Sequence, residues 1–130
     1  MRFVSRSVLF CAFCLLAFSS ASAQKSSKPA AFHTEGVFSN ITAGEGGDYS
    51  GMQIYLTDSD GQFYATVTIA EGVLLAPVLV KVKAQVEERK IEFELPGGDG
   101  PRKFTGTVSA SGLTLMEGGN KIVLKRICLD

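Results

Sequence analysis

The sequence predicts an all-β domain, an antiparallel meander of about eight strands that forms a closed or nearly closed up-and-down barrel. Short segments of alternating apolar and polar residues fill the chain after residue 32. Turn residues interrupt these segments about every 10 to 14 positions, a spacing typical of sandwiches and barrels. The turns also give neighbouring strands compatible registers with one shared apolar face, which a shift of one residue would destroy. A two-sheet β-sandwich is the alternative.

Residues 1–23 predict a secretory signal peptide. Arg2 and Arg6 precede an apolar run from Val8 to Phe18, and the small residues Ala21-Ser22-Ala23 precede Gln24. The run is too short for a bilayer-spanning helix, which needs about 20 apolar residues. We therefore expect cleavage near Ala23–Gln24 and a secreted or periplasmic protein with no membrane span.

The mature chain has the composition of one small exported domain. Cleavage removes two of the 13 basic residues and none of the 13 acidic ones, so the charge does not favour nucleic acid as a partner. About 107 residues suffice for a single domain that folds unaided. We predict a flexible tether at 24–31 and one β domain at 32–130. Cys128 is the one cysteine outside the leader, and we predict a free thiol, with an intermolecular disulfide as the alternative.

Each predicted strand follows from alternation and from the turn that ends it. The predicted strands are 34–39, 48–58, 62–70, 73–86, 90–95, 102–108, 112–116 and 121–128. In the first, Val37 and Phe38 compete for the inward position. Asp60-Gly61 is a favoured two-residue hairpin turn, which sets Leu56 opposite Ala65, Ile54 opposite Val67 and Met52 opposite Ile69.

Five further turns extend the meander. A turn at Glu71-Gly72 sets Phe63 opposite Val80. A turn at Glu87–Lys90 sets Val86 opposite Ile91 and Ala84 opposite Phe93, and the loop Pro96–Lys103 sets Phe104 opposite Leu95. The last two turns, Ser109–Gly112 and Met116–Lys121, set Leu113 opposite Val108 and Ile122 opposite Leu115. A helix starting at Pro77 and running through Val86 is the rival interpretation of the fourth segment. The alternation of β-branched Val78, Val80 and Val82 favours the strand.

The predicted inward face contains neither ionisable nor hydroxyl-bearing side chains, which argues against catalysis inside the domain. The inward set is Met52, Ile54, Leu56, Phe63, Ala65, Val67, Ile69, Leu74, Ala76, Val78, Val80, Val82, Ala84, Val86, Ile91, Phe93, Leu95, Phe104, Val108, Leu113, Leu115, Ile122 and Leu124. This interior forms either a packed core or the wall of an apolar ligand cavity, with Phe63, Phe93 and Phe104 as the predicted wall residues.

In topology alone, the meander resembles the up-and-down barrels of the lipocalin and avidin kind, the calycin-like barrels. Eight strands are the number at which a closed barrel can hold one small ligand. Those families place Trp at the barrel base or in the ligand site, whereas this chain has no Trp. No family residue is therefore carried over.

A cluster of apolar and Tyr side chains is predicted on the outward face. It consists of Tyr55, Tyr64, Leu75, Pro77 and Leu79, with Leu79 facing Tyr64 and Leu75 facing Thr68. Such clusters are typical of interaction surfaces. The alternative is that the tether or another loop covers it. Elsewhere on the outward face, Lys83 is expected to face Glu94.

The other motifs do not predict a metal site or a catalytic site. Asp58–Gly61 resembles the start of a calcium loop but reads as a turn, and one His with one mature Cys gives no zinc site. Asn40-Ile41-Thr42 is a glycosylation sequon. An enzyme would have to use His33 with Glu35. We predict no metal and no cofactor.

The sequence thus favours an exported, non-catalytic binding protein that carries a small apolar ligand. The alternative is a protein-interaction or envelope-associated module that uses the outward cluster. The partner is then a small apolar ligand or a protein, and the chain a monomer or weak homodimer.

Overall fold

The computed structural model describes residues 33–128, so the predicted signal peptide and tether lie outside the described residues. The described range contains no helix long and apolar enough to cross a membrane. Its regular structure is β-strand: β1 (Gly36–Ser39), β2 (Thr42–Ala43), β3 (Tyr49–Ser59), β4 (Gln62–Leu74), β5 (Val78–Gln85), β6 (Lys90–Leu95), β7 (Arg102–Val108), β8 (Gly112–Glu117) and β9 (Asn120–Ile127).

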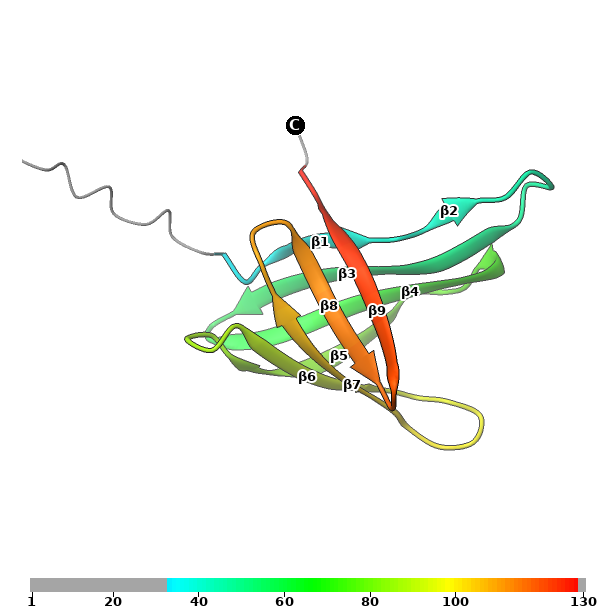
Figure 1. The fold of residues 1–130 in the computed structure, drawn as a ribbon. Coiled ribbons are helices and arrows are strands. Elements are labelled where there is room, and N and C mark those ends of the chain that lie inside the picture. Colours follow the sequence, from blue (N-terminus) through cyan, green and yellow to red (C-terminus); the bar gives the residue numbers. More distant parts are fainter. Residues whose placement is uncertain (1–32, 129–130) are drawn as a thin grey trace, which may run out of the picture.

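Eight of these strands form a closed antiparallel barrel, which confirms the predicted fold class (Figure 1). Consecutive strands pair from β3 to β9, and β1 closes the ring because it pairs with both β3 and β9. The short strand β2 adds to β3 outside the ring. Closure rules out the alternative sandwich, and β5 is a strand where the rival interpretation placed a helix.

Three predicted registers are confirmed. Asp60-Gly61 joins β3 and β4 with Leu56 opposite Ala65, and Asp60 adopts the positive φ of 53° that this turn requires. The β7–β8 turn sets Val108 opposite Leu113. The β8–β9 turn sets Leu115 opposite Ile122.

The predicted β4–β5 register is wrong by two residues. Phe63 lies opposite Val82 rather than Val80, because the chain does not turn at Glu71-Gly72. Instead β4 continues to Leu74. Its residues up to Gly72 pair with the first residues of β3, and the last of these pairs joins Tyr49 to Gly72. The turn comes at Pro77, which lacks the N–H that a ladder needs.

The next two registers are wrong by the same amount. Ala84 lies opposite Ile91, and Phe93 lies opposite Phe104. In each of these hairpins the pairing is shifted by two residues from the predicted register. Because side chains alternate with period two, this shift leaves the same side chains facing inward. Outward partners change accordingly, and Glu94 pairs with Lys103 at 3.5 Å instead of with Lys83.

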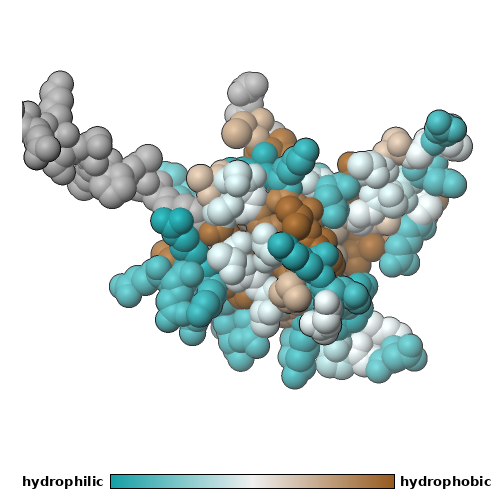
Figure 2. All heavy atoms as spheres, viewed as in Figure 1, coloured by the Kyte–Doolittle hydropathy of each residue, from teal (hydrophilic) through white to brown (hydrophobic). Residues whose placement is uncertain are grey.

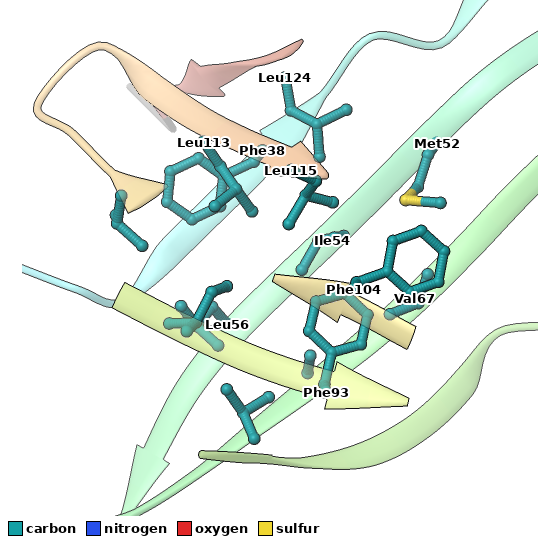
Figure 3. Close-up of a cluster of buried hydrophobic side chains, with 14 of the residues drawn as sticks. Phe38, Met52, Ile54, Leu56, Val67, Phe93, Phe104, Leu113, Leu115 and Leu124 are labelled. Carbon is teal, nitrogen blue, oxygen red and sulfur yellow. The ribbon is translucent and has the colours of Figure 1, made fainter. Parts of the chain in front are cut away.

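The apolar side chains of the inward face meet in one core inside the barrel (Figure 3). Phe38 resolves the ambiguity in the first strand, since it is fully buried at the centre of this cluster. Four residues of the predicted inward set lie instead on the surface. They lie near the two ends of β5, at the end of β4, in the β4–β5 connection, at the start of β5 and in the β5–β6 turn: Leu74, Ala76, Val78 and Val86.

Arg126 fastens the start of the domain to its last strand. Its Nη1 donates to the carbonyl of Glu35 at 2.7 Å, and its Nη2 donates to the carbonyls of His33 at 2.9 Å and Ser109 at 3.1 Å. The guanidinium also lies 4.6 Å from the centre of the Phe38 ring. These contacts reinforce the short β1–β9 ladder that closes the barrel.

Candidate functional site

Two of the predicted wall residues form a packed floor inside the barrel. Phe93 and Phe104 are cross-strand partners whose rings stack with centroids 5.1 Å apart and planes 12° apart. Both are buried, and Phe63 on β4 packs partly buried against the same core. The Phe93 and Phe104 rings therefore contact each other as part of the packed core inside the barrel.

An ion pair lies directly above this floor. The inward alternation of β7 extends from Phe104 to Arg102, and that of β8 extends from Leu115 to Glu117. Arg102 donates from Nε to Oε1 of Glu117 at 2.5 Å and from Nη2 to Oε2 at 2.8 Å. Its guanidinium also lies 5.4 Å from the centre of the Phe104 ring. The end of the barrel interior is therefore charged, which corrects the expectation of an inward face without ionisable groups.

The two members of this pair fix each other's charge. The hydrogen bond to Glu117 raises the pKa of Arg102 above its ordinary value, with partial burial acting in the opposite direction and Glu71 adding a weaker attraction. The same hydrogen bond from Arg102 lowers the pKa of Glu117. Because bidentate Arg–carboxylate pairs are geometrically specific, the pair holds the ends of β7 and β8 together at neutral pH.

An open cleft with apolar walls and a polar rim lies beside the ion pair at this end of the barrel, with a volume of about 280 Å³. Its lining includes Val67 and Ile69 of β4 and Leu95 of β6. Leu75 from the β4–β5 connection and Val78 from the start of β5 also line it. Arg102, Glu71 and residues 96–98 complete its rim. In Figure 2, apolar atoms reach the surface between β9 and the arm that β3 and β4 extend from the barrel.

The cleft exists because β5 changes partners along its length. Its residues Val78–Val82 pair with β4, whereas only Lys83–Gln85 pair with β6. The start of β5 therefore diverges from the end of β6. A second hollow of about 400 Å³ follows this seam, between Val80 and Lys83 on one side and Phe93 on the other.

A third hollow, of about 360 Å³, lies on the outer face of β5–β8. Charged groups of both signs line it, including Lys83 and Glu92, together with Thr105 and Thr107. Ile91 and Met116 also line it, so its lining is at least as apolar as that of the cleft, but its rim is charged, and we assign it no function.

The predicted outward cluster divides between two places. Tyr55, Tyr64 and Leu79 share the outer face of β3–β5, but Leu79 lies opposite Thr66 and Tyr64 lies opposite Lys81, so the predicted facing pair is wrong. Leu79 and Tyr64 remain diagonal neighbours. Leu75 and Pro77 lie instead in the β4–β5 connection beside the cleft.

This face continues across the barrel as a row of cross-strand partners. The row runs from Leu79 through Thr66 and Tyr55 to Val37 and Ile127. Leu79, Tyr55 and Ile127 are its exposed members. Alternation predicted Leu79 and Tyr55 on the outward face. It could not place Val37 and Ile127 beside them, because it did not show where the first strand pairs.

The remaining predicted residues do not form a site with one another. The Glu35 carboxylate accepts a hydrogen bond from the Asp58 amide at 2.9 Å, while the His33 carbonyl accepts one from Arg126. Asn40 is exposed, and its Oδ1 accepts from the Met52 amide at 2.7 Å. Cys128 is a free, exposed thiol. Glycosylation of Asn40 and acid–base chemistry at His33 stay predictions.

Within residues 33–128, no group of three or more His, Cys, Asp or Glu side chains is placed to hold a metal ion. Comparisons with protein-family models, with curated proteins and with solved structures gave no match. The function must therefore be argued from the barrel and its cleft.

Proposed function

We propose that this protein is an exported, non-catalytic binding protein that holds a small apolar ligand in the cleft at the open end of its barrel. One observation carries the proposal: a cleft of about 280 Å³ with apolar walls opens at the end of the barrel where Arg102, which lines the cleft, lies over the Phe104 ring. Its volume is close to the lower end of the range for ligand pockets, about 300 Å³. The ligand is therefore a small molecule that enters only the end of the barrel.

The charges of the cleft favour an uncharged ligand. Arg102 is the cation of the lining, and Glu117 already compensates its charge. A ligand carboxylate would have to compete with Glu117 and would also meet the exposed Glu71 on the rim. An apolar ligand instead gains by removing from water the exposed surfaces of Leu75 and Val78 and the partly exposed surface of Ile69.

The test is a titration of the mature protein with N-phenyl-1-naphthylamine, a small uncharged dye that fluoresces in apolar sites. We expect saturable binding of one dye per chain. Val78→Trp places an indole in the cleft from a partly exposed position, and we expect it to weaken binding by about tenfold or more. Val123→Trp on β9 is the matched control, since Val123 is exposed and does not line the cleft.

Absence of saturable binding would refute the proposal, and so would equal losses in the two variants. Native mass spectrometry of protein from a secreting host then examines the natural ligand. A mass increment that disappears on denaturation, and that is absent from Val78→Trp, is the expected result.

Protein binding through the outward row is the second candidate function. Tyr55 and Leu79 are 49% and 68% exposed and lie in the same row across β3, β4 and β5. Aromatic and large apolar side chains are enriched at interfaces. Tyr55→Ser should release a captured partner without altering dye binding, whereas a partner retained by this variant would exclude the row.

A further inference from the structure

The end of β4, the β4–β5 connection and the start of β5 together carry an exposed surface without polar side chains. Residues 72–80, called here the apolar corner, read Gly-Val-Leu-Leu-Ala-Pro-Val-Leu-Val. Val73, Leu74 and Leu79 are 63%, 54% and 68% exposed. Figure 1 shows β4 ending on the arm, away from the body of the barrel, so the corner is presented to its surroundings.

We infer that the apolar corner docks the protein on the surface of a zwitterionic lipid bilayer. The corner comprises nine residues, fewer than the roughly 20–30 that each partner contributes to a standard protein interface. Protein interfaces also carry about one hydrogen bond per 100–200 Å², and the side chains of the corner can form none. Hydrocarbon requires no such bonds.

The backbone of the corner agrees with shallow insertion. The Leu75 amide already donates to the Ile69 carbonyl at 2.8 Å, and Pro77 has no N–H. Two of the connection's backbone donors are therefore satisfied or absent, which lowers the cost of leaving water. Tyr49, 42% exposed and paired with Gly72 at the edge of the corner, suits the headgroup level, where Tyr is enriched.

The charges around the corner select a neutral surface. Glu71 precedes it and Lys81 follows it, both exposed. One charge of each sign does not favour the anionic surfaces that polybasic segments recognise. The corner also adjoins the cleft, since Leu75 lines it. A docked protein would thus hold its cleft beside the lipid, where an apolar ligand concentrates, although the docking itself does not depend on the proposed ligand.

The test is co-sedimentation of the mature protein with phosphatidylcholine vesicles. We expect binding that is unchanged between 0.1 and 0.5 M NaCl (roughly 10 and 4 Å Debye lengths), because the inserted surface is uncharged. The double variant Leu74→Ser and Leu79→Ser should bind at least about tenfold more weakly. The matched control is Met116→Ser with Val123→Ser, which removes two exposed apolar side chains from β8 and β9.

Because the chain has no Trp, a single Leu79→Trp reporter gives an independent readout. Its emission should shift to the blue on addition of vesicles, while that of Val123→Trp should not. Emission already blue-shifted without lipid would mean that another part of the chain covers the corner, and would overturn the inference. Absence of vesicle binding, equal loss in the control pair, or a solution dimer dissociated by the Leu74 and Leu79 substitutions would also overturn it.

Lipid docking and ligand binding are separable in the same variants. The double variant at Leu74 and Leu79 should lose vesicle binding but keep its affinity for the dye in solution, because neither residue lines the cleft. Loss of dye binding alone would thus refute the proposed function and leave the docking inference standing.

Discussion

The Arg102–Glu117 pair should stabilise the domain by an amount that depends on pH, and a double-mutant cycle measures it. The variants are Arg102→Met, Glu117→Gln and their combination. Exposed ion pairs are worth about 0.2–1 kcal/mol, and hydrogen bonds to charged groups about 1.5–3 kcal/mol. Because the Arg102 side chain is 37% exposed and that of Glu117 is 26% exposed, screening places the coupling energy near ~1 kcal/mol.

The sign of the pH dependence follows from the lowered pKa of Glu117. A carboxylate with a lowered pKa in the folded state contributes stability that is fully present above its unfolded value, about 4.3 for Glu. That stability is lost as the pH falls through the lower folded value. The coupling should therefore be constant from pH 7 to about pH 5 and should decline below about pH 4. The raised pKa of Arg102 adds no dependence in this range.

The assay is urea unfolding followed by far-ultraviolet circular dichroism, for all four proteins at several pH values between 7 and 3. Matched m-values would show that the variants unfold from comparable states. A coupling energy under about 0.3 kcal/mol at pH 7, within the additivity error of independent sites, would refute the reasoning. So would a coupling that stays constant down to pH 3.

Three further predictions concern the core and the closure of the barrel, and all are measured by urea unfolding. Phe104→Ala should lower the free energy of unfolding by about 3–5 kcal/mol, because the ring is fully buried; a loss under about 1 kcal/mol would contradict the packed floor. Gly112→Ala should unfold the domain readily, since its Cβ would overlap the Leu124 carbonyl, whereas Gly119→Ala, with open space around it, should change little; equal effects would count against this register. Arg126→Met removes three hydrogen bonds to backbone carbonyls and should cost about 1–3 kcal/mol; unaltered stability and amide exchange in β1 would show that it does not fasten the barrel.

The registers show where sequence reasoning succeeds and where it stops. Asp60-Gly61 specifies its own hairpin, because a two-residue turn with positive φ leaves one way to align its strands. Glu71-Gly72 looks equivalent in sequence, yet β4 passes through it because the start of β3 offers further partners. Gly72 keeps a positive φ of 76° without forming the turn. A local turn preference is therefore overridden where pairing with a strand elsewhere in the sheet forms more backbone hydrogen bonds.

The candidate site illustrates a second limit. The wall residues Phe93 and Phe104 were identified by alternation, but not their direct stacking, which depends on a register that alternation leaves undetermined by multiples of two. Arg102 and Glu117 were missed because the inward face was defined by apolar residues alone. Following the alternation of β7 and β8 to the next inward position would have reached these two charged residues. Their opposite charges at matching inward positions were the available signal.

The sequence by itself determined most strand positions, most of the inward face and the meander, because alternation of period two and turn residues act over a few neighbouring positions. Tertiary structure alone decided how β1 closes the ring between β3 and β9, where β5 leaves β6, and hence that a cleft opens beside the apolar corner. These features depend on hydrogen bonds between segments far apart in the chain. Their register is set by the total pairing gained around the barrel, which no single segment encodes.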